Sequence, residues 1–93
     1  MSVAFAALLL ALPPRPTAPS PGQVLFQKNC QRCHGADGRL GRNGAHDLTK
    51  SNLNAFGRTY LVTNGLGTMP AFKKILTPAQ IEQVVAYSLG LKP

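Results

Sequence analysis

Two cysteines and a histidine stand close together in the sequence and carry its clearest chemistry. The segment Cys30-Gln31-Arg32-Cys33-His34 has the form C-x-x-C-H, the attachment motif of c-type haem. Two residues between the thiols, at the end of a helix, let both thiols reach the vinyl groups on adjacent edges of a porphyrin. His34 then lies beneath the iron and offers a ring nitrogen. The motif therefore predicts one haem c, bonded through thioethers to Cys30 and Cys33, with His34 as an iron ligand.

Other sites built on paired cysteines fit this segment less well. A zinc site needs four ligands, and His46 is the one histidine outside the motif, with no second cysteine pair to join it. A thioredoxin-like redox pair requires a βαβ context, of which the sequence shows no sign. A disulfide across two residues closes a very short loop and would stabilise the fold little. A chance occurrence of the motif is the other alternative to haem.

The opposite face of the iron needs a second ligand, for which Met69 is the best candidate. Met69 lies in the segment Thr68-Met69-Pro70-Ala71-Phe72, where Pro70 stiffens the loop. An ordinary core methionine is the alternative interpretation. His46 is a rival ligand, although an early-loop or surface histidine is the simpler interpretation. A His34 and Met69 pair would raise the reduction potential and leave no position for a substrate.

Helices joined by loops are expected to position these residues, which makes the chain all-α. Apolar side chains at helical spacing over residues 22–33 predict a first helix. A second helix is predicted to begin after a cap at Ser51 or Asn52 and to end at Asn64-Gly65. Its expected apolar face consists of Leu53, Phe56, Tyr60 and Leu61.

The last helix has the strongest signals of the three. Thr77 is a natural N-cap, Pro78 suits the first helical position, and Gln80 completes a capping box. Gly90 is the predicted stop. The expected apolar stripe consists of Ile81, Val84, Val85 and Leu89. The remaining segments, 35–50 and 66–76, lack periodicity and predict loops.

The N-terminal part differs in composition from the rest. An apolar run over residues 3–12 is too short to span a bilayer, which takes about 20 residues, and a proline-rich stretch follows it. We expect residues 1–21 to form a signal peptide or an N-terminal apolar segment with a proline-rich linker, and residues 22–93 to form the folded domain. A signal peptide predicts a periplasmic or equivalent compartment, and a retained segment predicts a membrane tether.

The charge balance indicates the class of partner. The chain has 93 residues, enough for one domain, and ten Lys plus Arg against three acidic residues give a net charge of +7. The sequence has no basic run or basic-aromatic interleaving, which argues against nucleic acid. An acidic protein partner is expected instead. The basic residues expected to ring the exposed haem edge are Lys28, Arg32, Lys73 and Lys74. Lys50 and Lys92 are expected on an ordinary solvated face.

Taken in order along the chain, these features resemble the class I c-type cytochromes, and among them the small monohaem bacterial proteins of the c6 and c-55x type. The resemblance is carried by Gly22-x-x-x-Phe26, Cys30-Gln31-Arg32-Cys33-His34-Gly35, Leu48-Thr49, Asn64-Gly65, Met69-Pro70-Ala71-Phe72 and Val85-Ala86-Tyr87. It implies the cytochrome c fold, with three to four helices wrapped around one covalently bound haem. It also implies that the first and last helices cross, with Gly22 and Phe26 meeting the Tyr87 region.

One departure from the family pattern concerns the support of His34. Members of the family commonly have a proline two residues before the loop leucine, here Leu48, and the carbonyl of that proline accepts the proximal histidine's Nδ1–H. His46 stands at this position. Because a backbone carbonyl does not depend on its side chain, we expect His46 to keep the bond, with looser support than a proline gives. Arg39, Arg42 or Arg58 is expected to pair with a haem propionate.

The predicted function is one-electron transfer rather than catalysis, because the chain offers no catalytic constellation. The expected partners are redox proteins with acidic docking surfaces, such as a membrane oxidoreductase, a terminal oxidase or a dehydrogenase. One alternative is a haem subunit of a larger dehydrogenase or oxidase complex. Another is a haem sensor or peroxidase in which Met69 is displaced. The predicted cofactor-binding residues are Cys30, Cys33, His34 and Met69.

Overall fold

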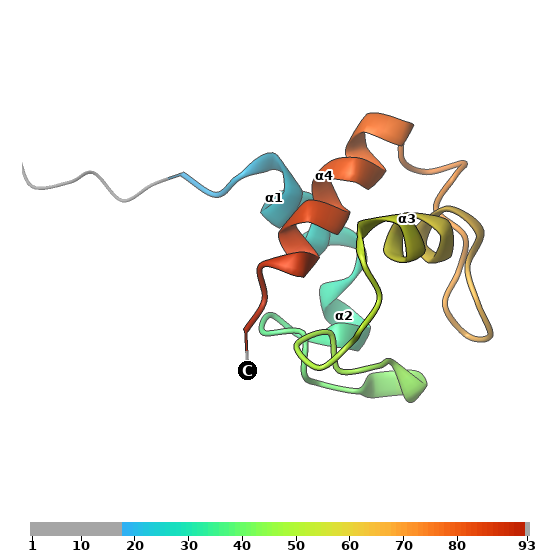
Figure 1. Cartoon of the computed structure of the whole chain (residues 1–93). Helices are drawn as coiled ribbons and strands as arrows, with labels where there is room; N and C mark the ends of the chain where they lie inside the picture. Colours follow the sequence, from blue (N-terminus) through green and yellow to red (C-terminus); the bar gives the residue numbers. More distant parts are fainter. Residues whose placement is uncertain (1–17, 93) are drawn as a thin grey trace, which may run out of the picture.

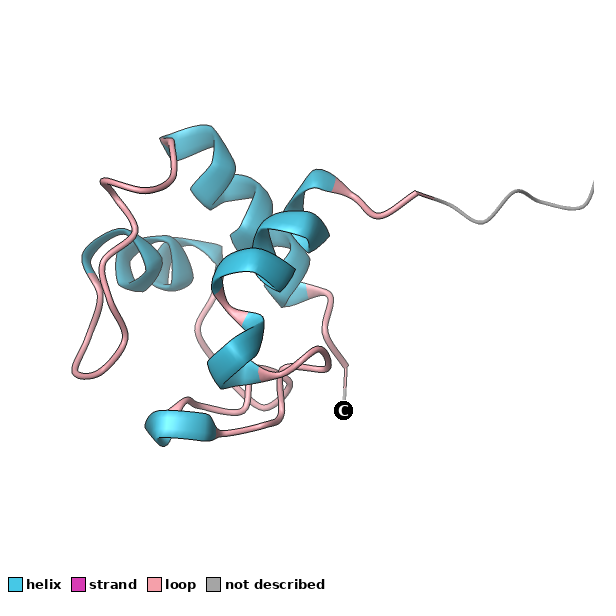
Figure 2. Cartoon of the chain, turned by 180° about the vertical axis from the view of Figure 1, so that it is seen from behind, coloured by secondary structure: helices cyan, strands magenta, loops and turns pink. Residues whose placement is uncertain are grey.

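A computed structural model describes residues 18–92, which form helices and loops (Figure 1). The elements in chain order are α1 (Pro21–Asn29), α2 (Gln31–His34), the 3-10 helix η1 (Arg42–Gly44), α3 (Ala55–Asn64) and α4 (Pro78–Leu89). Within these residues no strand is drawn (Figure 2), and the strand-like pairing is an isolated bridge between Leu66 and Met69. The all-α class is therefore confirmed. Most of the predicted N-terminal segment lies outside the described residues.

Helices α1 and α4 cross and form the framework of the fold (Figure 1). A Cβ atom at Gly22 would collide with the backbone carbonyl of Gln83 in α4, so glycine is required for this close approach. One turn later, the rings of Phe26 and Tyr87 meet at a centroid distance of 5.2 Å and a tilt of 56°. The contact expected between Gly22, Phe26 and the Tyr87 region is confirmed.

The first helix is shorter than the sequence predicts. Ser20 caps it by accepting a bond from the Gln23 N–H at 3.2 Å, and Pro21 occupies the first turn. The helix ends at Asn29, and Cys30 adopts φ −117° and ψ −32° before α2 begins. The expectation of one helix over 22–33 is wrong at this point, because the backbone bends at the first cysteine of the motif.

Helix α4 follows the sequence signals closely. Thr77 and Gln80 form the predicted capping box, with bonds of 3.2 Å and 2.9 Å, and the helix ends before Gly90. Its buried side chains join α1 and the loop before α4 in one core, which consists of Phe26, Phe72, Leu76, Ile81, Val84 and Val85. Leu89, predicted in this stripe, is 39% exposed, and Ser88 is buried instead.

Helix α3 begins later than predicted. Asn54 caps it by accepting the Gly57 N–H at 2.9 Å, so the predicted caps Ser51 and Asn52 are wrong and Leu53 precedes the helix. The predicted end at Asn64-Gly65 is confirmed. Gly65 has φ +75°, and a Cβ there would approach the Met69 carbonyl oxygen at 2.6 Å. This glycine therefore lets the chain turn directly into the loop that carries Met69. None of the helices within residues 18–92 is long and apolar enough to cross a membrane.

Candidate functional site

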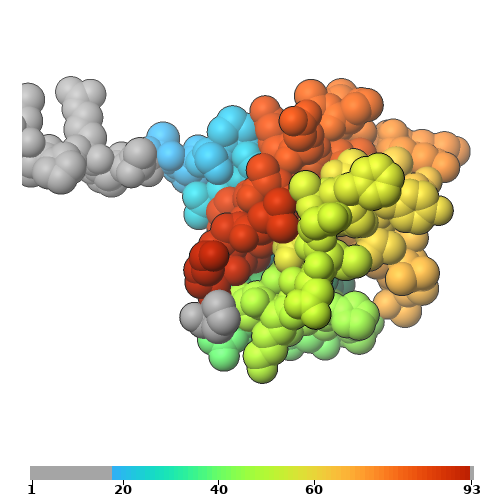
Figure 3. Space-filling model, viewed as in Figure 1, coloured from blue at the N-terminus to red at the C-terminus, as the bar shows by residue number. Residues whose placement is uncertain are grey.

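A cavity of about 810 Å³ opens between α2, α3, α4 and the loops around them. The space-filling view is hollowed where the orange loop, the yellow helix α3 and the green loop meet (Figure 3). The volume of the cavity falls within the roughly 300–1,000 Å³ of typical ligand sites. The lining residues that precede α3 include Phe26, Cys30, His34, His46 and Leu48. Those in α3 and after it include Phe56, Arg58, Tyr60, Leu61, Met69 and Val84.

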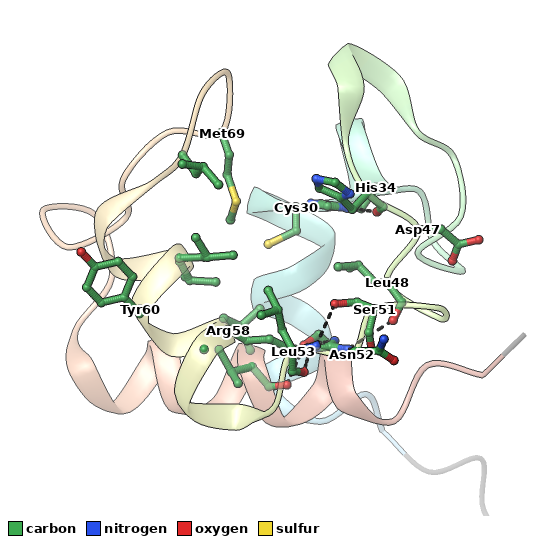
Figure 4. A pocket seen from close by; sticks show the side chains of 18 of the residues that line it. Cys30, His34, Asp47, Leu48, Ser51, Asn52, Leu53, Arg58, Tyr60 and Met69 are labelled. Carbon is green, nitrogen blue, oxygen red and sulfur yellow. Dashed lines mark hydrogen bonds between the residues drawn. The ribbon is translucent and has the colours of Figure 1, made fainter.

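Three of the four predicted cofactor-binding residues line this cavity, although they come from distant parts of the chain. His34 at the end of α2 and Met69 in the loop after α3 project from opposite sides, and the Cys30 thiol lies between them (Figure 4). The fourth residue, Cys33, is half-buried in α2 beside His34. The fold thus brings the two predicted iron ligands face to face.

The His34 ring is oriented by the backbone of the next loop. Its Nδ1 lies 3.0 Å from the His46 carbonyl oxygen, so the expected bond is confirmed (Figure 4). Because a carbonyl accepts and cannot donate, Nδ1 carries the proton and the Nε2 lone pair is left for a metal. Burial lowers the pKa of the His34 imidazole, and the bond to His46 opposes that shift. Burial therefore favours the neutral ring, which is the form that ligates metals.

The two thiols have different surroundings. Burial, with the nearby Cys33, raises the pKa of the Cys30 thiol to about 11. The Cys33 sulfur lies 3.6 Å from the Asn43 side-chain nitrogen, which donates to it. No disulfide joins the two cysteines within the described residues. The pair stands at the bend between α1 and α2, with Cys30 inside the cavity and Cys33 toward η1.

The loop that carries Met69 forms a tight turn. The backbones of Leu66 and Met69 exchange two hydrogen bonds of 3.0 Å, and the chain returns to α3 through the Phe72 N–H, which donates to Val62 at 2.9 Å. The Thr68 hydroxyl donates to the Asn43 carbonyl at 2.8 Å and links this loop to η1. Met69 packs against the hydrophobic core. The turn and this packing direct its side chain into the cavity.

Arg58 is a charged side chain buried in the cavity wall, at 8% exposure. Its Nε donates to the Leu53 carbonyl at 2.9 Å, and one terminal nitrogen donates to the Ser88 hydroxyl at 3.0 Å (Figure 4). The other terminal nitrogen donates to the carbonyls of Leu48 and Ser51. These partners are all neutral. Burial lowers the pKa of the guanidinium, which nevertheless stays charged in proteins.

The sequence predicted candidate ligands but not the character of the cavity wall. Phe56 and Tyr60 were expected on an apolar helix face, yet they are 84% and 63% exposed and line the cavity. The burial of Arg58 was also missed, and its position as the one charged residue of α3 is the signal that could have found it. Of the predicted basic ring, all four residues are exposed, and Lys50 is the lysine that lines the cavity within the described chain.

A helical fold with a Cys-x-x-Cys-His motif on one wall of an apolar cavity and a methionine on the other defines a c-type cytochrome. Residues 17–87 match the family model described as "Cytochrome C oxidase, cbb3-type, subunit III". Because this match covers more than half of the chain and cytochromes c6 are similar over most of their length, the chain belongs to the class I c-type cytochromes.

Relatives and solved structures agree with this assignment. Cytochrome c6 from Gloeothece citriformis is 45% identical over 74 residues, which cover 73% of this chain and 66% of that protein, just under two thirds of its length. Cytochrome c6 from Rippkaea orientalis is 38% identical over 92 residues, 92% of this chain and 82% of that protein. The structure of cytochrome c6 from the diatom Phaeodactylum tricornutum is 27% identical, with a TM-score of 0.60 over 74% of this chain and 87% of that one. The KustC0563 c-type cytochrome is 25% identical, with a TM-score of 0.71 over 77% and 98%.

Membership of this family implies haem c as the resident cofactor, and the residues present fit it. The cavity is apolar along most of its wall, as a porphyrin requires, and Cys30 lies in the wall with Cys33 close by. A neutral imidazole and a thioether face each other, which is the ligand pair that haem iron accepts. The buried Arg58 adds a cation that suits an acidic group of the cofactor.

Proposed function

We propose that the protein is a one-electron carrier whose haem c is held covalently by Cys30 and Cys33 and ligated by His34 and Met69. The observation that carries this proposal is the placement of His34 and Met69 on opposite sides of one apolar cavity. When bound, the haem supplies the one-electron iron couple. The Cys30 and Cys33 thiols would each add across a vinyl group, forming a sulfur–carbon bond while the thiol hydrogen goes to the neighbouring carbon.

Electron transfer, rather than catalysis, follows from the two ligands. If His34 and Met69 both ligate the iron, no position on it would be left for a substrate. His34 would be held by its bond to His46, and Met69 by its tight turn. A haem sensor or peroxidase requires Met69 to leave the iron. An iron(III)–thioether charge-transfer band at neutral pH supports the electron carrier, and absence of that band supports a sensor or peroxidase.

Arg58 is the proposed partner of a haem propionate. Of the three arginines considered, Arg58 lines the cavity and is buried, whereas Arg39 and Arg42 are exposed outside that wall. A buried cation bonded to neutral groups is costly unless an anion approaches it. A propionate would supply that anion.

The proposed partners are redox proteins with acidic docking surfaces, and nucleic acid is not among them. The chain has a net charge of +7, and Lys28, Arg32, Lys73 and Lys74 are all exposed. A positive surface steers acidic partners at low salt. Electron-transfer rates with an acidic partner are therefore expected to fall steeply as ionic strength rises. Electron-transfer rates that do not change with ionic strength would contradict the proposal of acidic partners.

We place the protein in the periplasm or an equivalent compartment, with residues 22–93 as the cytochrome domain and residues 1–21 as a signal or tether segment. Covalent haem attachment and N-terminal processing are tested together by the intact mass of protein made with a c-type haem maturation system. The wild type is expected to have a mass one haem above that of the apoprotein. The fraction of molecules with this added mass is expected to fall in Cys30→Ala or Cys33→Ala and to be zero in the double variant. A wild-type mass with no haem would overturn the proposal.

A second candidate is a haem subunit of a larger oxidase or dehydrogenase complex. The match of residues 17–87 to a model described as an oxidase subunit favours it. Native mass spectrometry distinguishes the mobile carrier from the subunit, when the protein is expressed from its own promoter and then purified. A lone species of about the chain mass plus haem supports the mobile carrier, whereas co-purification in a stable stoichiometric complex supports the subunit.

A further inference from the structure

The bond from His34 to His46 raises the question of what fixes the accepting carbonyl. A proline at this position would restrain φ through its ring, whereas His46 has no such restraint. The His46 side chain is exposed. The bond nevertheless forms at 3.0 Å. The restraint on this carbonyl must therefore come from neighbouring groups.

Asp47, the residue that follows, forms the most strongly bonded turn of this loop. One oxygen of its carboxylate accepts both the Thr49 N–H, at 2.9 Å, and the Thr49 hydroxyl, at 2.6 Å. A side chain that accepts the N–H two residues later closes an Asx turn, which fixes the backbone around it. The Lys50 N–H also donates to the Asp47 carbonyl at 3.2 Å.

The same turn is anchored to the segment that follows the haem motif. The Leu48 N–H donates to the Gly38 carbonyl at 2.9 Å, and the Leu40 N–H donates to the His34 carbonyl at 2.9 Å. Hydrogen bonds therefore connect the residues that follow the His46–Asp47 peptide to the segment that follows His34. The carbonyl that faces the His34 ring belongs to this peptide.

We propose that Asp47 is a positioning residue for the iron ligand His34, because the turn that its side chain closes restrains the peptide whose carbonyl accepts from the His34 ring. Asp47 acts through the His46 carbonyl and does not touch the imidazole. The proposal rests on the proposed function, because it takes His34 to be an iron ligand. The direct partner of His34 is the His46 carbonyl, and loss of such a partner typically changes metal affinity or activity by about 10–100-fold. Loosening that carbonyl through Asp47 is expected to have a smaller effect of the same kind.

The test measures exchange of the His34 Nδ1–H with deuterium in holoprotein, followed by proton NMR of the haem ligands. In Asp47→Ala, exchange is expected to be faster than in the wild type, by up to about tenfold. Thr49→Val, which removes the 2.6 Å bond but keeps the carboxylate, is expected to accelerate exchange less. Asn54→Ala is the control, because the Asn54 side chain accepts the Gly57 N–H at 2.9 Å at the start of α3 and belongs to none of the bonds that hold the His46 carbonyl.

The rescue variant separates positioning from general destabilisation. Ala45 is already extended, at φ −61° and ψ 133°, as the residue before a proline must be. His46→Pro in the Asp47→Ala background is expected to restore slow exchange. Exchange within twofold of wild type in both Asp47→Ala and Thr49→Val would overturn the proposal. A wild-type spectrum without an iron-bound histidine would instead overturn the proposed function.

Discussion

The two sides of the cavity hold their proposed iron ligands by different means. On the His34 side, the ligand ring itself has a hydrogen-bond partner, the His46 carbonyl, and the loop behind it is fixed by the bonds from Thr49 to Asp47. On the Met69 side, the ligand is placed by a tight backbone turn and by packing against the hydrophobic core. On the first side a hydrogen bond reaches the ligand ring itself, whereas on the second the hydrogen bonds lie in the backbone turn and the Met69 side chain is held by apolar contact.

This difference predicts which substitutions will disturb each side of the cavity. Polar bonds to a single atom fix direction, so the His34 side should tolerate loss of nearby apolar volume but respond to changes in charge or bonding. Packing fixes position through many weak contacts, so the Met69 side should respond to loss of volume. The following predictions test whether the two sides behave independently.

The largest expected effect comes from removing the ligand on the packed side. Met69→Ala should keep the haem, because both thiols and His34 remain, but lose the iron(III)–thioether band. The reduction potential should fall on the order of 0.1 V, within the range of about 0.8 V that axial ligands span. Spectroelectrochemistry measures both changes. Leu40→Ala, at an exposed position outside the cavity wall, is the control and should leave them as in wild type. An unchanged band in Met69→Ala would assign the ligand to another residue.

The next effect tests the packing behind Met69. Phe72 is 6% exposed, and Phe72→Ala is expected to lower the free energy of unfolding by about 3–5 kcal/mol. On heating, the thioether band should disappear at a lower temperature than the signal of the His34-bound iron. Phe72→Leu keeps most of the volume and should cost about 1 kcal/mol. Ile75→Ala, at a 63% exposed position, should stay within about 0.5 kcal/mol of wild type. Simultaneous loss of both iron signals in every variant would show that the two sides are one cooperative unit.

Local signals in the sequence predicted much of the fold and the ligands. The Thr77 and Gln80 capping box, the stop at Asn64-Gly65 and the C-x-x-C-H motif depend on neighbouring residues, so they are visible without tertiary structure. The break at Cys30 was not predictable in this way, because the apolar spacing continues through it. The cap at Asn54 was hidden among adjacent polar residues that cap equally well by type.

The cavity wall was the part that sequence could not resolve. Phe56 and Tyr60 have the same spacing whether they face a protein core or a cofactor, and periodicity alone cannot distinguish the two. Leu89 likewise has the spacing of a core residue, but Ser88 is buried instead, where it accepts a bond from Arg58. A buried arginine with neutral partners is a tertiary feature, and only the assembled cavity explains it.

A smaller effect is expected from the link between the two sides of the cavity mouth. Thr68→Val removes the hydroxyl that donates to the Asn43 carbonyl and keeps the side-chain shape. The expected loss is about 0.5–1.5 kcal/mol in the free energy of unfolding, with weaker resistance of the thioether band to added imidazole. Thr59→Val, which removes a hydroxyl bonded within α3 to the Ala55 carbonyl, is the matched control. Equal imidazole affinity in the two variants would show that the Thr68 bond does not restrain Met69.

The smallest expected effect is a pH dependence on the His34 side. The bond from the Thr49 hydroxyl lowers the pKa of the Asp47 carboxyl most, with Lys50 and Arg39 adding to the shift and partial desolvation opposing it. Because the folded pKa lies below the unfolded value of about 4, the Asp47 charge stabilises the fold above that pH, and this contribution disappears as pH falls through the folded pKa. Urea unfolding of wild type and Asp47→Asn, compared from about pH 6 to about pH 3, should show wild type more stable at the higher pH and a narrowing gap in acid. A gap that stays constant with pH would mean that the difference between the two proteins does not come from the Asp47 charge.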